Sequence, residues 1–64
     1  MKILRLPQVI DKTGLSRTTV YESIRRGDFP NPIQLTERSI GWREHEIDEW
    51  IESRESVTIA GTIQ

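Results

Sequence analysis

Hydroxyl and guanidinium side chains gather between residues 16 and 26 of this 64-residue chain. An arginine guanidinium donates a fork of hydrogen bonds that matches the acceptor edge of guanine, and a threonine offers a hydroxyl or a methyl group to a base edge. The first turn of a helix adds unpaired N–H groups that suit a phosphate. This chemistry is recognition of a nucleic acid rather than the making or breaking of bonds. The candidate contact residues in this stretch are Ser16, Arg17, Thr18, Thr19, Tyr21, Arg25 and Arg26.

One predicted helix, over residues 17–26, positions these side chains. Ser16 is a favourable N-cap, and Leu15 before it packs against Val20 as a hydrophobic staple. Val20 and Ile24 lie four residues apart and define the buried stripe, and the glycine at position 27 closes the helix. At about 100° per residue, the opposite face points away from the core. That face carries Thr18, Glu22, Arg25 and Arg26, with Thr19 on its shoulder and Arg17 and Tyr21 on the other flank.

Several of these residues also have an ordinary structural explanation. Ser16 is above all a helix cap, and Tyr21 suits half-burial against Phe29 as well as it suits phosphate contact. Glu22 repels phosphates unless it accepts a hydrogen bond from a cytosine amine or pairs with Arg26 four residues on. The Glu22–Arg26 ion pair is the preferred prediction.

The segment before this helix completes a helix-turn-helix. Pro7 suits the first position of a helix and Gly14 is a stop signal, so a short helix is predicted over 7–12, after an extended segment over 3–6. Residues 13–15 then form a tight turn that contains glycine between two short helices. That is the sequence outline of a helix-turn-helix.

A β-hairpin follows the second helix. Apolar and polar residues alternate over 33–36, the turn is predicted at 37–39, and the return strand is predicted over 40–42. Arg38 lies at the tip of the turn, where a solitary arginine can enter a narrow minor groove of DNA. Arg38 and its neighbour Ser39 are therefore candidate contact residues as well.

A third helix follows, because apolar residues recur there at helical spacing through Ile47, Trp50 and Ile51, with Arg54 next in the same row. The predicted fold class is therefore mainly α with a small β-hairpin: three helices in a winged helix-turn-helix over residues 1–55. The tail over 56–64 is expected to be frayed.

The two parts of the chain differ in charge. Residues 1–43 hold eight Lys and Arg against four Asp and Glu, a formal charge of +4, whereas residues 44–64 hold one Arg against six acids, a charge of −5. Such asymmetry is a cue for a nucleic-acid face. The acids of the third helix are interpreted as a solvated face that keeps DNA away from the rear of the protein.

Composition argues against several other classes of protein. With no cysteine and one histidine, thiolate and imidazole metal sites are not expected, and no cofactor is expected. The carboxylates of the third helix lack a nucleophile–base pair or a glycine-rich loop, so neither an enzyme nor a small-molecule substrate is expected. No signal peptide or membrane span is recognisable, so a cytoplasmic location is expected.

The stretch LRLPQVIDKTGLSRTTVYESIRRGDFPNPIQL, followed by SIGWREHEIDEWIESR, resembles the AlpA family. These are small phage and prophage DNA-binding regulators related to excisionases and to the DNA-binding part of MerR-like proteins. The resemblance covers about residues 3–55, and its most specific parts lie over 13–21, 27–30 and 41–43. It implies that the helix over 17–26 enters the major groove and that the turn over 37–39 is the wing.

The resemblance further implies that a protein of this kind regulates transcription of integrase or excision genes. The alternatives are an architectural excisionase (recombination directionality factor) that bends attachment-site DNA, and a protein-interaction adaptor that uses the acidic third helix. A chain this small covers less than one turn of DNA, so several copies, as a homo-oligomer or a cooperative array, are expected on double-stranded DNA.

Overall fold

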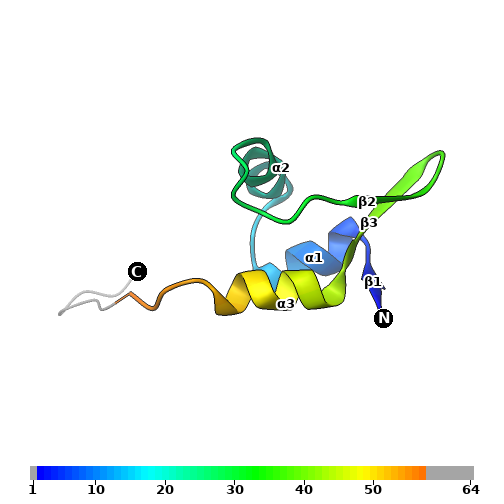
Figure 1. Cartoon of the computed structure of the whole chain (residues 1–64). Helices are drawn as coiled ribbons and strands as arrows, with labels where there is room; N and C mark the ends of the chain where they lie inside the picture. Colours follow the sequence, from blue (N-terminus) through cyan, green and yellow to red (C-terminus); the bar gives the residue numbers. More distant parts are fainter. Residues whose placement is uncertain (1, 58–64) are drawn as a thin grey trace.

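The computed structural model describes residues 2–57. Within that range the chain forms three helices and three strands: β1 (Ile3–Leu4), α1 (Leu6–Thr13), α2 (Arg17–Arg25), β2 (Ile33–Thr36), β3 (Ser39–Arg43) and α3 (Glu44–Glu52) (Figure 1). The strands form an antiparallel sheet in the order β1-β3-β2. The predicted fold class, a winged helix-turn-helix with three helices and a hairpin, is confirmed. Of the tail expected to be frayed, residues 58–64 lie outside the described range.

α1 begins one residue earlier and ends one residue later than predicted. Its start is fixed by the backbone N–H of Arg5, which donates to the side chain of Gln8 at 2.8 Å. Gly14 ends the helix in the left-handed conformation, with φ +76°, and donates its N–H to the carbonyl of Ile10 at 2.8 Å. Three residues then separate α1 from α2, which gives the predicted helix-turn-helix.

α2 is fixed at both ends by hydrogen bonds that its sequence encodes. Ser16 Oγ accepts from the N–H of Thr19 at 3.1 Å, so the predicted N-cap is confirmed. At the other end Gly27 is left-handed, with φ +77°, and the N–H of Asp28 reaches back to the carbonyl of Ser23 at 2.8 Å. This Schellman closure ends the helix one residue earlier than predicted.

The sheet differs from the prediction in two respects. Ile3–Leu4, expected to be merely extended, pairs with the end of β3, so the hairpin belongs to a three-stranded sheet. The turn contains Glu37 and Arg38 alone, because Ser39 already pairs with Thr36. The predicted three-residue turn is therefore one residue too long.

A β-bulge in β2 explains the shorter turn. The pairing register shifts by one residue between Gln34 and Thr36, which leaves Leu35 as the extra residue. The predicted alternation of buried and exposed residues consequently fails, since Leu35 is 37% exposed and only Ile33 of this strand is half-buried. The bulge brings the tip of the hairpin to a sharp two-residue end.

The core contains one or more residues from nearly every element. Trp42 Nε1 donates to the carbonyl of Pro30 at 3.0 Å, and Trp50 Nε1 donates to the carbonyl of Asp28 at 2.7 Å. These two bonds anchor the loop after α2 to β3 and α3. They thereby help to fix the orientation of α2 relative to the core. The buried apolar residues are Leu4, Val9, Val20, Phe29, Trp42 and Ile47.

α3 ends before Arg54, although the helical spacing of Ile47, Trp50, Ile51 and Arg54 suggests a longer helix. The helix ends at Glu52, with Ser53 as its C-cap. Arg54 therefore lies beyond the helix, where its guanidinium carbon is 4.7 Å from the centroid of the Trp50 ring. The cation covers the exposed side of a half-buried indole.

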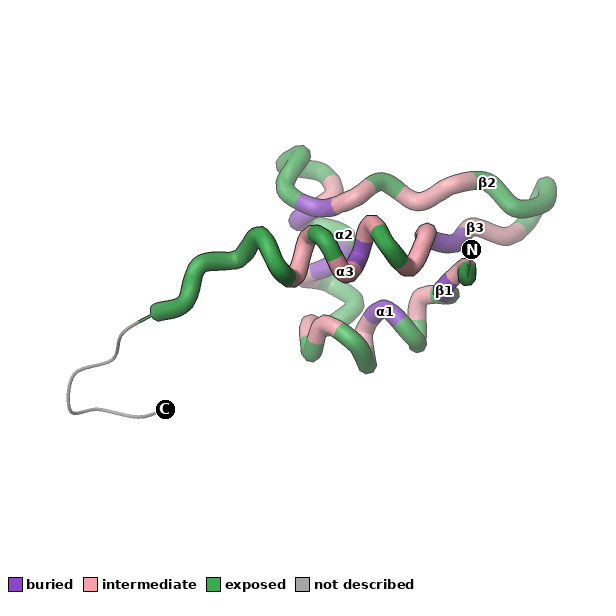
Figure 2. The backbone as a smooth tube through the Cα atoms, turned by 60° about the horizontal axis from the view of Figure 1, so that its bottom comes forward, coloured by how far each residue is buried: buried purple, intermediate pink, exposed green. Residues whose placement is uncertain are grey.

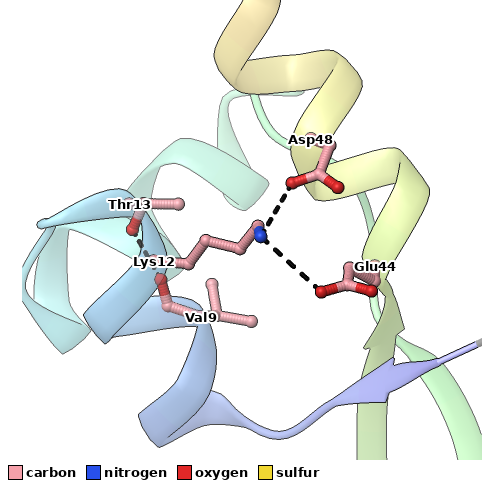
Figure 3. A network of polar contacts seen from close by, with 5 residues as sticks. All are labelled: Val9, Lys12, Thr13, Glu44 and Asp48. Atoms are coloured by element: carbon pink, nitrogen blue, oxygen red, sulfur yellow. Dashed lines mark hydrogen bonds and ion pairs between the residues drawn. The ribbon is translucent and has the colours of Figure 1, made fainter.

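Lys12 joins the helix-turn-helix to α3 (Figure 3). Its ammonium lies 3.0 Å from the carboxylate of Asp48 and 3.6 Å from that of Glu44. On the other side of α3, Arg43 lies 3.7 Å from Glu46. The predicted solvated face of α3 is confirmed for Glu49 and Glu52, which are exposed, whereas Glu44, Glu46 and Asp48 are half-buried and pair with cations of the basic part of the chain.

The Lys12 contacts predict a dependence of stability on pH. The hydrogen bond to Asp48, which is the main cause, raises the pKa of Lys12 above its ordinary value of 10.5. A raised pKa in the folded state stabilises the protein below the unfolded pKa, and this contribution is lost as the pH rises through the folded pKa. We expect Lys12→Met to lower the thermal midpoint slightly at pH 7 but not at a pH above the raised pKa. A difference that is the same at both pH values would contradict this expectation.

Candidate nucleic-acid interface

The solvent-facing side of α2 carries the side chains that the sequence predicts. Val20 and Ser23 are buried and Ile24 is half-buried, so this side of the helix faces the core. The predicted stripe omits Ser23, although its position three residues after Val20 places it on the same face. Thr19 is half-buried, and Tyr21 is 39% exposed. The exposed residues here are Ser16, Arg17, Thr18, Tyr21, Glu22, Arg25 and Arg26.

The first turn of α2 leaves two backbone N–H groups without a hydrogen-bond partner within residues 2–57. The Ser16 hydroxyl donates to the Thr19 hydroxyl at 2.9 Å and accepts from the Thr19 N–H, while the Ser16 carbonyl accepts from the N–H of Val20 at 3.0 Å. Within residues 2–57, no hydrogen bond engages the N–H of Arg17 or Thr18. These two groups, at the positive end of the helix dipole, remain available to a phosphate oxygen.

The end of α2 departs from the prediction. Arg26 is the C-cap, and its guanidinium lies 3.4 Å from the hydroxyl of Ser23 and 3.9 Å from the carboxylate of Asp28. The predicted Glu22–Arg26 ion pair is therefore wrong: Asp28, placed by the Schellman closure, is the partner of Arg26. Within the described part of the chain, the carboxylate of Glu22 makes no ion pair.

The tip of the hairpin presents Arg38 on a braced turn. The backbone N–H of Arg38 donates to the hydroxyl of Thr36 at 3.2 Å, and that hydroxyl lies 2.6 Å from the hydroxyl of Ser39. The Gln34 amide donates to the carbonyl of Thr36. The side chain of Arg38 is exposed, whereas Ser39 is half-buried and its hydroxyl serves the turn. Gln34 also braces the turn, a role that the sequence does not predict because the bulge leaves no recognisable pattern in it.

α2 and the hairpin tip lie on the side of the molecule opposite α3. In Figure 1, α3 runs along the bottom while α2 and the hairpin reach the top, and in Figure 2 α3 lies in front of α2. Arg17 and Arg25 belong to α2 and Arg38 to the hairpin tip, and none of them forms an ion pair within residues 2–57. The basic and acidic parts of the sequence therefore lie on different sides of the molecule, with α2 and the hairpin tip on one side and α3 on the other.

A metal-ligand cluster and a membrane-spanning helix are both absent from residues 2–57. Within that range no three His, Cys, Asp or Glu side chains are grouped so as to hold a metal ion. No helix of the described part is long and apolar enough to cross a membrane.

Comparison with known proteins connects this arrangement with prophage regulators. The family described as "Prophage CP4-57 regulatory protein (AlpA)" matches residues 2–55. The "DNA-binding transcriptional activator AlpA" of Escherichia coli strain K12 is 47% identical over 60 residues, covering 84% of this chain and 86% of that protein. The "Uncharacterized protein ORF88" of Enterobacteria phage P4 is 40% identical over 53 residues. That match covers 83% of this chain but only 60% of the phage protein.

Proposed function

The chain belongs to the AlpA family of prophage regulatory proteins, and on that premise we propose that it is a sequence-specific double-stranded DNA-binding protein that regulates transcription. The proposed targets are integrase or excision genes of a prophage. In this proposal α2 lies in the major groove, the β2–β3 turn is the wing, and residues 1–55 form the DNA-binding unit. The observation that carries the proposal is the exposed face of α2, with its cap and its guanidinium and hydroxyl groups, on the side away from α3.

Electrostatics supports the same orientation. A duplex carries one negative charge per roughly 1.7 Å of its axis. Were α3 to face the duplex, Glu49 and Glu52 would meet that charge, and both are exposed. Approach through α2 and the hairpin tip instead presents the exposed guanidinium groups of Arg17, Arg25 and Arg38.

Fluorescence anisotropy with labelled duplexes tests the proposal. The duplexes would be promoter fragments of neighbouring prophage genes, with a shuffled duplex as the control. If three or four phosphates are neutralised, log K is expected to fall with log salt at a slope of about −3. The absence of binding to every duplex at low salt would refute a DNA-binding function.

Arg38→Ala is expected to weaken binding to all duplexes by a similar factor. An arginine at a narrow minor groove reads electrostatic potential and groove shape more than base identity, so its loss affects specific and shuffled DNA together. We expect about a fivefold loss of affinity and a salt slope smaller by about one, if a single phosphate contact is removed. Retention of full affinity on both duplexes would place the hairpin tip away from DNA.

More than one copy is proposed to bind each operator. A single module of this size buries about 600–1,000 Å² on DNA, which is small for selecting one site in a genome. Symmetric pairs or an array of copies on repeated short sites would supply the missing affinity. A footprint at saturation that never exceeds one short half-site would contradict this part of the proposal.

Two further assays separate transcriptional regulation from an architectural role. An architectural excisionase would bend its site strongly in a gel-based bending assay while leaving a promoter reporter unchanged. The adaptor hypothesis uses the acidic face of α3, where Glu44, Glu46 and Asp48 are engaged with Arg43 and Lys12 while Glu49 and Glu52 are exposed. The ion pairs therefore leave a smaller acidic face for a basic protein partner.

A further inference from the structure

Glu22 is the one acidic side chain on the exposed face of α2 within residues 17–25. Its nearest cations in the helix are Arg25, three residues on, and Arg26, four residues on. Neither guanidinium lies within ion-pair distance of the Glu22 carboxylate, and Arg26 is turned to Ser23 and Asp28. An ion pair with Arg25 or Arg26 therefore does not explain why this position is acidic.

A free carboxylate here opposes DNA binding in general. It faces the same way as Thr18, one turn earlier, and lies in a helix proposed to enter the major groove. A carboxylate has only acceptor oxygens, and phosphates repel it. A hydrogen-bond donor on the DNA that meets this carboxylate would offset the repulsion.

The major groove offers two amine donors, N4 of cytosine and N6 of adenine. The adenine amine lies beside N7, an acceptor that repels the second carboxylate oxygen. The cytosine amine has no such acceptor beside it on that base. A carboxylate therefore prefers cytosine, whereas a carboxamide of the same shape suits the donor–acceptor pair of adenine.

We propose that Glu22 is a specificity-determining residue that accepts a hydrogen bond from the N4 amine of a cytosine in the major groove. This inference rests on the proposed DNA-binding function and adds to it a defined base class at one position of the site. Glu22 contributes discrimination rather than affinity, because its charge weakens binding to every sequence that lacks the cytosine.

The experiment selects bound duplexes from a randomised pool with the wild-type 64-residue chain, Glu22→Ala and Glu22→Gln. Affinities for duplexes that differ at single bases are then measured. We expect the wild type to favour cytosine at one position by about tenfold. Glu22→Gln is expected to change that preference to adenine, and Glu22→Ala to abolish it while binding shuffled DNA more tightly. Glu52→Gln, an equal change of charge on exposed α3, should leave the base preference unchanged.

Two results would overturn the inference, and they differ in meaning. If both Glu22 variants bind all duplexes more tightly with an unchanged base preference, Glu22 acts only by repulsion, and the DNA-binding function stands without this contact. If the wild type binds no duplex at all, the proposed function fails and the inference fails with it. Because Glu22 is exposed and makes no ion pair within residues 2–57, both variants are expected to melt like the wild type, which circular dichroism would verify.

Discussion

Replacing Trp42 with alanine is expected to leave the protein unfolded at 25 °C. Trp42 is 0% exposed and is among the largest fully buried side chains in residues 2–57. Removing a buried aromatic side chain costs about 3–5 kcal/mol, and a domain of this size rarely has more than about 3–5 kcal/mol of net stability. The measurement is the far-ultraviolet circular dichroism and its thermal transition, which the variant should lack.

Two other substitutions separate the contributions of the indole. Trp42→Phe keeps most of the apolar volume but loses the hydrogen bond from Nε1 to the Pro30 carbonyl, so it should fold with a stability lower by about 1–2 kcal/mol. Trp50→Ala removes a half-buried ring and should cost less than Trp42→Ala. A Trp42→Ala chain that melts like the wild type would mean that the core is organised differently.

The helices were predictable because their signals are local. Ser16 and Gly27 mark the two ends of α2 within a dozen residues, and the structure uses both, one as a cap and the other in a Schellman closure. Val20 and Ile24 give the buried face through their spacing alone. The exposed face, and hence the candidate contact residues on α2, follows from the same two residues.

The sheet was less predictable because it depends on contacts that are distant in sequence. β1 contains only Ile3 and Leu4, too few residues for an alternation, and its partners Arg43 and Trp42 lie about forty positions on. The bulge at Leu35 likewise leaves no mark in the alternation of types over 33–36. Pairing register is decided by the facing strand, which the local pattern does not contain.

The ion pairs were the least predictable feature, because they depend on how each helix ends and on how the helices are placed relative to one another. Glu22 and Arg26 have the spacing of a helical pair, but the closure at Gly27 brings Asp28 to Arg26 instead. Lys12 and Asp48 belong to different helices, so only the packing of α1 on α3 joins them. The charges counted along the sequence therefore overstate how many cations of residues 1–43 and how many acids of residues 44–64 are unpaired.

Arg17→Ala is expected to weaken binding to the preferred duplex by about 1–3 kcal/mol, if its guanidinium grips a base edge, and to weaken binding to shuffled DNA far less. Arg17 is the first residue of α2, is exposed, and has no ion-pair partner within residues 2–57. Anisotropy titrations on both duplexes measure the two losses. Arg54→Ala is the matched control, since it removes the same charge beside Trp50, beyond the end of α3.

Stability should respond to Arg17→Ala in the opposite direction. A cation at the N-terminus of a helix is unfavourable, because it meets the positive end of the helix dipole at a cost of about 0.3–1 kcal/mol. The free protein therefore gains nothing from Arg17, and the variant should melt at the same temperature as the wild type or slightly higher. A favourable effect of Arg17 is therefore expected in the complex with DNA rather than in the free protein. If Arg17→Ala lowered the melting temperature and left affinity for the preferred duplex intact, the proposed placement of α2 in the groove would be wrong.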